Sequence, residues 1–457
     1  MAIGLTAYRM VTGALGPPLA GLLGGLGSSD GVWRAGFRGA SEEARRAAGS
    51  IWVHAASMGE VGMARTWIEA LLERGERAPI LMTTRTRTGL ARARGEMGEL
   101  VAARIAPHDL PWVIGSLLAC ARPRRLDVIE TEIWPNMILE ARRRSSAVVF
   151  VSAAVSERSA RRLRILSIAG RALLGDGVYA LPQSGPHASR FESLGIPRER
   201  IRVMGDLKAA GSARVEEDLP AFGSRPALVF GSLRPGEEDA ALRVAGQLEE
   251  HRKHEAKRRA APGGGGLEGA FEGRSRALLV IAPRHPEGEA RARAAFGSSG
   301  FELEVRDEPT RDGDVRAWID QISSRPGPRV ALLATRGELA RAYGAAWGAV
   351  IGGTVAPFGG HNVWEPAARG CPVLVGPHHA QVATAVDAII AEGGGAVAGD
   401  AGERLHEALA SWLRDPELER AGAAAARAAA RASGATERGI EALAAWGLLP
   451  GAAAGSV

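Results

Sequence analysis

Residues 51–72 read Ile-Trp-Val-His-Ala-Ala-Ser-Met-Gly-Glu-Val-Gly-Met-Ala-Arg-Thr-Trp-Ile-Glu-Ala-Leu-Leu. The first five residues form a compact, largely apolar run, which is typical of a strand buried on both faces. The next segment, Val61–Leu72, places Trp67, Ile68, Leu71 and Leu72 on one face of a helix. A buried strand followed directly by an amphipathic helix predicts a parallel sheet wrapped by helices.

The same alternation continues along the chain and restarts near residue 226. Each expected strand is a short apolar run between turn or helix signals. We therefore predict an α/β protein with two doubly wound, Rossmann-like domains that face a central cleft. The strands are expected at Ile51–Ala55, Ile80–Thr84, Leu126–Glu130, Val148–Ser152, Ile201–Met204, Ala227–Gly231, Leu278–Ala282, Val330–Ala334, Ala349–Gly352 and Pro372–Val375.

This pattern divides the chain into four parts. An N-terminal domain is expected at 31–215 and a C-terminal domain at 226–420, after a leader at 1–30 and before a helix and tail at 421–457. Residues 251–276 are rich in lysine and arginine and then in glycine, so we expect a disordered insertion there.

The composition excludes several function classes. Hydrophobic residues make up 46% and charged residues 24%, the balance of a soluble globular protein with sizeable cores. The net charge of +6 would favour binding to nucleic acid, to an anionic membrane or to a phosphorylated substrate. No zinc finger, aromatic-interleaved basic stripe or long basic run is present, so no nucleic-acid partner is expected.

The leader carries no charge from Met10 to Ser29, but Pro17 and Pro18 split the run and glycines dilute it. It could be a weak anchor, an interfacial helix or a first core helix. We favour membrane association.

Several charged side chains follow expected strands of the first half. Glu60 comes after the first strand, where it could accept a proton from a substrate hydroxyl or simply cap its helix. Glu130 and Glu132 follow another strand and could hold sugar hydroxyls, bind a metal or be solvated. Lys208 follows the expected strand Ile201–Met204 and suits a carboxylate or phosphate.

The second half has its own polar motifs. Arg284-His285 follows an expected strand, and the block Gly359-Gly360-His361-Asn362-Val363-Trp364-Glu365-Pro366 is the richest in the chain. Glycines before an asparagine-led helix expose N–H groups that suit an anion, and Glu365 could accept hydrogen bonds from a ribose. Asp312-Gly313-Asp314 is interpreted as a turn rather than a metal site.

Taken together, these motifs resemble the Kdo transferases of lipopolysaccharide biosynthesis, from about Trp52 to Gly393. The matching segments are His-Ala-Ala-Ser-Met-Gly-Glu (54–60), Thr83-Thr84, Thr88-Gly89, Pro-His-Asp-Leu-Pro (107–111), Glu-Thr-Glu-Ile-Trp-Pro-Asn (130–136), Ser-Glu-Arg-Ser (156–159), Gln183-Ser184, Leu194-Gly195, Gly-Asp-Leu-Lys (205–208), Pro-Arg-His-Pro (283–286), Gly-Glu-Leu (337–339), the Gly359–Pro366 block and Gly-Pro-His (376–378).

The resemblance implies a GT-B glycosyltransferase fold and an inverting transfer of Kdo from CMP-Kdo to a phosphorylated lipid A precursor, with release of CMP. It implies Glu60 as the catalytic base and Glu130 and Lys208 as residues that stabilise the transition state. It implies no cofactor and no metal, because arginines and helix-terminal amides can hold the single phosphate. The implied CMP site comprises Arg284, His285, Arg336, Gly337, Glu338, Asn362, Val363, Trp364 and Glu365; phosphate or acceptor contacts are expected from Ser57, Gly59, Glu132, Gly359, Gly360 and His361.

The resemblance also implies work at the cytoplasmic face of the inner membrane, with peripheral or weak anchoring through the leader. The chain departs from the family pattern at Ser152-Ala153-Ala154, at Leu233-Arg234 and at Ala334, which bears on acceptor preference and on the number of sugars added. Two alternatives remain open from the sequence: a nucleotide-sugar 2-epimerase of the same fold, and a non-catalytic basic membrane-binding protein.

Overall fold

The structure is a computed structural model that describes residues 3–14, 31–144, 146–166, 173–213, 219–260, 276–308, 314–399 and 403–449. The chain divides into two compact units. Unit 1 comprises Met1–Gly211 and Ser433–Val457, and unit 2 comprises Ser212–Ala432. The segment 421–457, treated above as one helix and tail, is thus shared between the units, because its last helix packs on unit 1.

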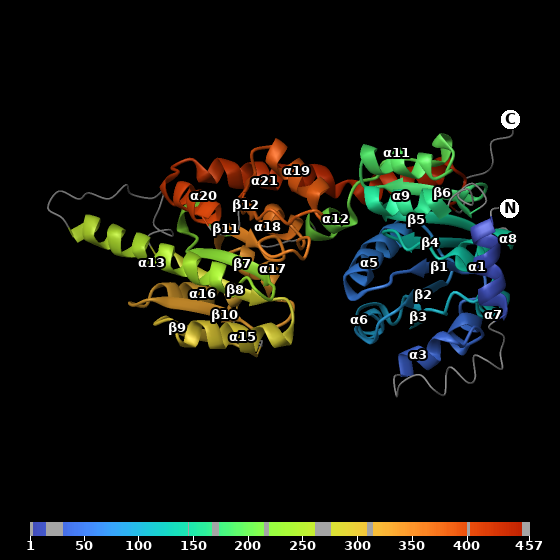
Figure 1. The fold of residues 1–457 in the computed structure, drawn as a ribbon, viewed down its shortest axis with the longest axis horizontal. Helices are drawn as coiled ribbons and strands as arrows, with labels where there is room; N and C mark the ends of the chain where they lie inside the picture. The colour runs from blue at the N-terminus through green and yellow to red at the C-terminus, as the bar shows by residue number, and fades with distance from the viewer. Residues whose placement is uncertain are drawn as a thin grey trace. The chain divides into compact units, whose positions relative to one another are not determined.

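The described part of unit 1 contains a six-stranded parallel sheet in the order β3-β2-β1-β4-β5-β6 (Figure 1). This is the order of a doubly wound dinucleotide-binding fold, in which the chain winds outward from β1 in one direction and then restarts at β4 on its other side. The strands are β1 (Ile51–His54), β2 (Ile80–Thr84), β3 (Ala102–Ile105), β4 (Arg125–Ile129), β5 (Ala147–Ala153) and β6 (Val178–Pro182).

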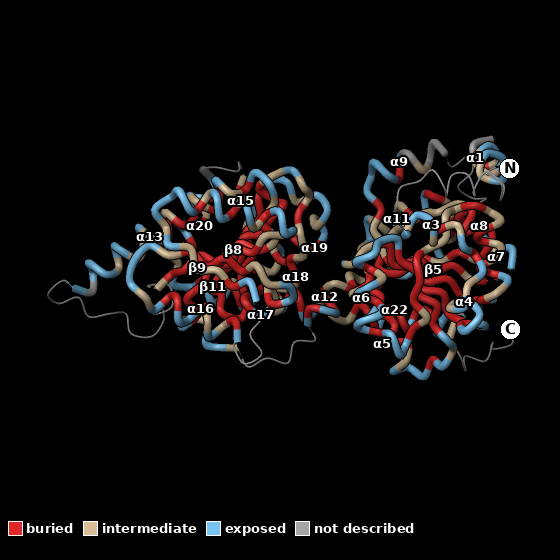
Figure 2. The backbone as a smooth tube through the Cα atoms, turned by 90° about the horizontal axis from the view of Figure 1, so that it is seen from below, coloured by how far each residue is buried: buried red, intermediate tan, exposed pale blue. Residues whose placement is uncertain are grey.

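Successive strand residues of unit 1 point into two separate cores. Trp52 belongs to the apolar cluster on one side of the sheet and Val53 to the cluster on the other. Buried residues accordingly follow the strands in each unit (Figure 2).

The described helices from the N-terminus to the start of unit 2, together with the last helix of the chain, are α1 (Ile3–Ala14), α3 (Gly31–Gly36), α4 (Glu42–Arg46), α5 (Met58–Glu73), α6 (Arg87–Met97), α7 (Pro111–Ala121), α8 (Pro135–Arg143), α9 (Glu157–Leu166), α11 (Gly185–Ser193), the 3₁₀-helix η2 (Arg198–Arg200), α12 (Leu207–Ala213) and α22 (Ala435–Ala445).

The described part of unit 2 contains a seven-stranded parallel sheet in the order β13-β12-β11-β7-β8-β10-β9. Its strands are β7 (Ala227–Leu233), β8 (Leu278–Pro283), β9 (Glu302–Arg306), β10 (Arg329–Leu333), β11 (Ala346–Ile351), β12 (Val373–Val375) and β13 (Gly395–Val397). Its helices are η3 (Phe222–Ser224), α13 (Glu238–Ala260), α15 (Pro286–Gly297), α16 (Val315–Ser323), α17 (Leu339–Tyr343), α18 (Trp364–Ala368), α19 (Ala383–Ala391), α20 (Glu403–Arg414) and α21 (Leu418–Ser433).

The predicted fold class is confirmed, but some strand predictions were wrong. The segment Ile201–Met204 forms only an isolated bridge between Ile201 and Ala180. Four strands were missed: β3, β6, β9 and β13. All four are outer strands of their sheets, each with a neighbouring strand on one side only.

The expected disordered insertion is wrong for residues 251–260, which continue helix α13, whereas residues 261–275 lie outside the described residues. Charge pairs at helical spacing explain the helix. Glu249 pairs with Arg252 at 3.1 Å and with Lys253 at 3.6 Å, and Glu255 pairs with Arg258 at 3.0 Å. Pairs of this kind stabilise a polar helix by a few tenths of a kcal/mol each, roughly.

Candidate active site

The candidate residues of unit 1 follow β1 and β4, the two strands between which the order of the strands in the sheet reverses. β1 and β4 are neighbours although β2 and β3 intervene in the chain. In open parallel sheets ligands bind outside the carboxyl ends of the strands at such a switch point. Glu60 follows β1 and Glu130 follows β4, so the topology brings these two carboxylates to one edge of the sheet.

Glu60 is held in place by the first turn of its own helix. Ser57 is the N-cap of α5, and its hydroxyl accepts from the Glu60 N–H at 3.3 Å. The Glu60 carboxylate in turn accepts from the Ser57 hydroxyl at 2.9 Å and from the Ala56 N–H at 2.8 Å. This reciprocal arrangement is a form of capping box. Capping and catalysis are therefore compatible for Glu60, because the cap fixes the direction of the carboxylate.

The surroundings of Glu60 change its acidity. Burial and then the negative charge of Glu130 raise the pKa of Glu60 to about 7, against the lowering effect of its two hydrogen bonds. Glu132 adds a smaller upward push. A carboxylate whose pKa lies near neutral pH is suited to general base catalysis, since it is partly deprotonated and still basic.

The pH dependence of activity should follow this pKa. If Glu60 acts as a base it must be deprotonated, so kcat/KM should rise through about pH 7 and level off above it. Glu132→Gln removes one negative charge near Glu60 and should move the midpoint of the rise to lower pH. Steady-state rates across the pH range, with wild type in parallel, measure the shift; a flat wild-type profile around neutrality contradicts the prediction.

Glu130 and Lys208 form an ion pair beside Glu60. The Lys208 ammonium donates to Glu130 at 2.6 Å. Burial lowers the pKa of Lys208, but the charges of Glu130, Asp206 and Glu60 outweigh it, so the pKa is raised and the ammonium is retained. Glu130 has φ +57°, a left-handed conformation that costs about 1–2 kcal/mol outside glycine. The structure thus brings the three predicted catalytic residues together in unit 1.

Ser152, one of the departures from the family pattern, supports the helix that carries Lys208. Its hydroxyl accepts from the Leu207 N–H at 3.1 Å at the start of α12. Ser152 has φ +52°, a region that asparagine adopts more readily than serine. The hydrogen bond to α12 offsets part of that strain.

Glu132 lies with two side chains at the same edge of the sheet. It accepts from the Trp134 indole N–H at 2.6 Å and lies 3.7 Å from the Arg85 guanidinium, which stacks 4.6 Å above the Trp134 ring. The predicted ligand contact Ser57 is engaged with Glu60 instead. Gly59 lies in the first turn of α5, where an added Cβ would meet only the Ser57 hydroxyl, at 3.8 Å.

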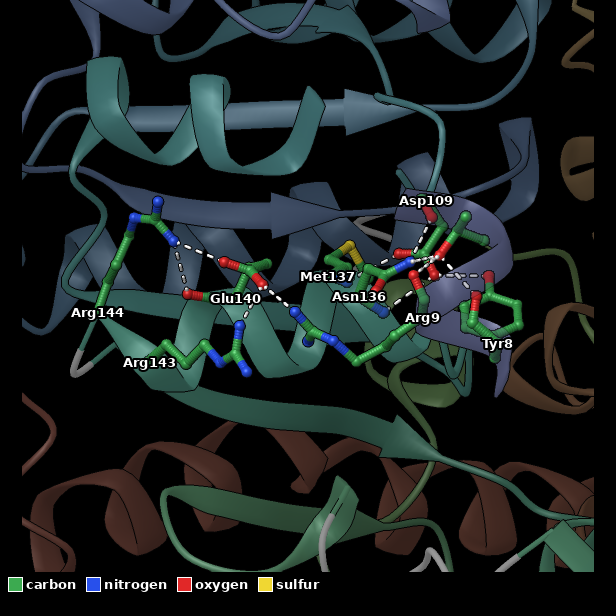
Figure 3. A network of polar contacts seen from close by, with 9 residues as sticks. Tyr8, Arg9, Asp109, Asn136, Met137, Glu140, Arg143 and Arg144 are labelled. Carbon is green, nitrogen blue, oxygen red and sulfur yellow. Dashed lines mark hydrogen bonds and ion pairs between the residues drawn. The ribbon is translucent and has the colours of Figure 1, made fainter. Parts of the chain in front are cut away.

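The described part of the leader, helix α1, is attached to unit 1 by a polar network (Figure 3). The Tyr8 hydroxyl donates to Asp109 at 2.8 Å, and the other Asp109 oxygen accepts from the Met137 N–H at 2.7 Å. Arg9 pairs with Glu140 at 2.8 Å. Residues 15–30 of the leader lie outside the described residues, and no described helix is long and apolar enough to cross a bilayer.

In unit 2 the order of the strands in the sheet reverses between β7 and β11. Two arginines, Arg234 and Arg336, lie close enough to Arg284 to interact with it electrostatically. Arg336 donates to the Arg284 carbonyl at 3.3 Å, and Arg234 lies 4.2 Å above the Phe358 ring. Burial lowers the pKa of Arg284; Glu365 counteracts this, while Arg336 and Arg234 add to it. A cluster of guanidinium groups with one carboxylate suits a ligand that carries both a phosphate and hydroxyls. His285 is the exposed N-cap residue of α15 beside this cluster.

The glycine-rich block forms a tight turn before α18. Gly359 and Gly360 have φ of +92° and +96°, and a Cβ on Gly359 would lie 2.5 Å from Gln381. Asn362 accepts from the Trp364 N–H at 3.0 Å and donates to Glu365 at 3.1 Å. The Asn362 side chain therefore orients Glu365. α18 has five residues, so its dipole is weaker than a long helix would supply.

Three other residues of the predicted CMP site, Glu338, Val363 and Trp364, have buried side chains. Glu338 is buried and accepts two hydrogen bonds from Arg306, at 2.8 and 2.7 Å. Gly337, with φ +86°, forms the turn between Arg336 and Glu338. His361 lies beside Gly353, where a Cβ on that glycine would be 3.2 Å from its ring.

Sequence reasoning missed Glu237, which organises this edge of unit 2. Its fully buried carboxylate accepts from the N–H groups of Arg234, Gly353, Val355 and Ala356 at 2.8–3.1 Å. The loops after β7 and β11 are joined through this one side chain. Gly236-Glu237-Glu238 looks like a solvated turn in the sequence, and only burial distinguishes Glu237 from its neighbour.

In the described part of the chain, no group of three or more His, Cys, Asp or Glu side chains could hold a metal ion. Asp314 caps α16 through the Arg316 N–H at 3.0 Å, while Asp312 and Gly313 lie outside the described residues.

Comparisons with known proteins show to which family the chain belongs. The family profile described as 3-deoxy-D-manno-octulosonic-acid transferase (kdotransferase) matches residues 33–210. The 3-deoxy-D-manno-octulosonic acid transferase of Bordetella pertussis is 33% identical over 429 residues, covering 90% of this chain and 91% of that protein. The chain belongs to the 3-deoxy-D-manno-octulosonic acid (Kdo) transferase family. A Haemophilus influenzae transferase of the same name is 27% identical and covers 72% of this chain and 70% of its own length.

Solved structures agree with the fold of this Kdo transferase family member. A UDP-N-acetylglucosamine 2-epimerase from Listeria monocytogenes, described as putative, has a TM-score of 0.55 at 14% identity and covers 88% of this chain and 97% of its own. A glycosyltransferase from Rickettsia africae has a TM-score of 0.51 at 11% identity, covering 86% and 96%. The predicted GT-B glycosyltransferase architecture is thus confirmed, and membership of the Kdo transferase family makes the chain a glycosyltransferase.

Proposed function

We propose that the chain transfers Kdo from CMP-Kdo to a phosphorylated lipid A precursor and releases CMP. The observation that carries the proposal is the cluster in unit 1, where Glu60, with a pKa of about 7, lies beside the Glu130–Lys208 pair. Glu60 removes the proton from an acceptor hydroxyl. The hydroxyl oxygen then bonds to the anomeric carbon of Kdo as the bond from that carbon to the CMP phosphate breaks.

The nucleotide is proposed to bind unit 2. Arg284 and Arg336 would neutralise the single phosphate of CMP, and Glu365, oriented by Asn362, would accept hydrogen bonds from the ribose. Glu237 would act as a positioning residue, since it holds the loops that surround these groups. Because one monophosphate would leave and the two guanidinium groups would neutralise it, we expect the transfer to need no metal ion.

CMP binding tests the site in unit 2. Arg284→Ala and Glu365→Ala should each weaken CMP binding by about 1–3 kcal/mol, the range for a hydrogen bond to a charged group. Arg293→Ala serves as the matched control, because Arg293 lies on the exposed side of α15 and pairs with Glu289. Isothermal titration calorimetry measures the affinities; unchanged values in both site variants would refute the placement.

The rival epimerase function shares the fold but is not favoured, because similarity to epimerases at 14% identity concerns the fold alone. The decisive experiment is incubation with CMP-Kdo and tetra-acylated lipid A precursor, with and without EDTA, followed by mass spectrometry of the lipid. A lipid enlarged by Kdo, with equal CMP release in both reactions, supports the proposal. Loss of CMP-Kdo without lipid modification contradicts it.

The proposed site of action is the cytoplasmic face of the inner membrane, with peripheral or weak attachment. Met10 and Val11 of α1 are 64% and 65% exposed, although Tyr8 and Arg9 attach the same helix to unit 1. Exposed apolar side chains on an attached helix can enter the lipid interface, and nearby basic residues add about 1 kcal/mol each at an anionic surface.

Replacing both exposed residues, Met10→Ser with Val11→Ser, should lower co-sedimentation with anionic liposomes several-fold without unfolding unit 1. Leu100→Ser is the matched control, because Leu100 is also an exposed apolar residue of unit 1 (47%) but lies outside α1. Raising the salt concentration should weaken the binding of all three proteins. Equal binding of the double variant and the control would place the contact surface elsewhere.

A further inference from the structure

Unit 1 contains a pocket of about 280 Å³ at the carboxyl ends of β1 to β4. Its lining is mostly apolar and aromatic, with Trp33, Pro107 and Trp134 among the wall residues and Arg85 and His54 among the polar ones. Ligand pockets begin at about 300 Å³, so this one has room for a single ring-sized group and not for a whole lipid.

His54, one of the wall residues of this pocket, carries an unsatisfied polar atom. The residue is only 2% exposed, and its Nδ1 lies 2.9 Å from the Thr83 hydroxyl. Its Nε2 is buried and has no hydrogen-bond partner among the described residues. Buried polar atoms are nearly always hydrogen-bonded, so this exception at a pocket wall points to a ligand. Burial, reinforced by Arg85, lowers the pKa of His54 to about 4, so the ring is neutral at physiological pH.

The other polar groups of the pocket differ in their availability. Asp109 also lines it, but its oxygens accept hydrogen bonds from Tyr8, from the Asn136 N–H at 3.0 Å and from the Met137 N–H. Arg85 is half exposed, with its guanidinium 3.7 Å from Glu132. His108 also lines the pocket, with its Nε2 3.0 Å from the Trp33 carbonyl. His54 and Arg85 are thus the wall residues that offer a ligand a buried ring nitrogen without a partner and a half-exposed guanidinium.

One residue, Ala56, connects the pocket to the proposed catalytic base through its backbone. The Ala56 N–H donates to the Glu60 carboxylate at 2.8 Å, and the Ala56 carbonyl accepts from the Arg85 N–H at 3.1 Å. Glu132, which contributes to the raised pKa of Glu60, is also the carboxylate nearest the Arg85 guanidinium. Two backbone hydrogen bonds of Ala56 thus link Glu60 to Arg85, a wall residue of the pocket.

We propose that this pocket binds one pyranose ring of the acceptor, next to the reacting hydroxyl, with His54 Nε2 hydrogen-bonded to a polar ring substituent and Arg85 bound to an anionic one. The apolar face of a pyranose suits the indole walls of Trp33 and Trp134, whereas an acyl chain would leave Nε2 unsatisfied. The inference rests on the proposed function, since it defines how that acceptor is held.

The test uses the full chain without CMP-Kdo, so that its outcome does not depend on transfer. Glucosamine 1-phosphate, glucosamine and inorganic phosphate are titrated to high millimolar concentration, and indole ¹⁵N–¹H shifts are followed. Trp33 and Trp134 signals are assigned with the corresponding phenylalanine variants. Glucosamine 1-phosphate should shift both indoles, glucosamine should do so more weakly, and phosphate alone should not.

His54→Phe should lower the binding affinity for both sugars about tenfold, which is the effect of one lost hydrogen bond in a buried site. Arg85→Gln, at a half-exposed position, should weaken the binding of glucosamine 1-phosphate about tenfold and that of glucosamine little. Arg87→Gln, exposed and outside the pocket, is the control and should bind like wild type.

Three results overturn the proposal: no indole shift with either sugar, equal shifts with phosphate alone, or wild-type affinity in both His54→Phe and Arg85→Gln. If the sugars bind as expected but the lipid is not modified by CMP-Kdo, the pocket stands and the proposed function fails. If the lipid is modified but the sugars do not bind, the proposed function stands and the proposed sugar pocket fails.

Discussion

Glu60→Gln is expected to lower the turnover number by about two to four decades while the affinity for CMP-Kdo stays unchanged. The change removes the basic oxygen that would accept the proton of the acceptor hydroxyl. It preserves shape and the capping role, because glutamine also serves at this position of a capping box. The loss can then be attributed to chemistry and not to unwinding of the first turn of α5, as it could not with alanine.

The matched control is Glu69→Gln in the same helix, where the carboxylate pairs with Arg65 at 2.7 Å on the outer side. It should retain full activity, since surface pairs contribute about 0–1 kcal/mol. Single-turnover rates with saturating donor, together with CMP-Kdo titrations of each protein, separate chemistry from binding. Near-normal turnover of Glu60→Gln would remove Glu60 from its proposed role.

Glu237→Ala is expected to destabilise unit 2 by about 2–4 kcal/mol, because four backbone N–H groups lose a common acceptor in a buried place. Burial raises the pKa of this carboxyl even though these N–H donors lower it, so the network keeps a charge in an unfavourable setting. The Gly353–Ala356 loop should then open more readily, and CMP affinity should fall with it.

Hydrogen exchange measures this effect directly at the amides of Gly353, Val355 and Ala356, which should exchange at least tenfold faster in the variant. Glu302→Ala is the control: its carboxylate also forms an ion pair, with Arg329 at 2.7 Å, but is 60% exposed on the edge strand β9. Protected amides in Glu237→Ala would mean that the loop is held by other contacts.

The sequence alone determined the features that depend on near neighbours. The apolar run of β1 and the helical face of α5 are periodic patterns, so the β–α unit and the position of Glu60 after its strand could be predicted. Ser57 and Glu60, three residues apart, form a local cap for the same reason. The outer strands of the two sheets could not be predicted from their weaker patterns, because little of the stability of such a strand comes from its own sequence.

Only the tertiary structure decided which distant residues meet. Lys208 reaches Glu130 across 78 positions because the sheet order places β4 and β5 beside the loop before α12. In the sequence Glu237 looks like a residue of a solvated turn, and only the loops after β7 and β11 bury its carboxylate. His54 is one residue of an apolar strand, and its unsatisfied nitrogen becomes visible only when the pocket walls are assembled. The physical reason is the same in each case: burial and charge neighbours, which set pKa and hydrogen-bond satisfaction, are properties of the packed chain.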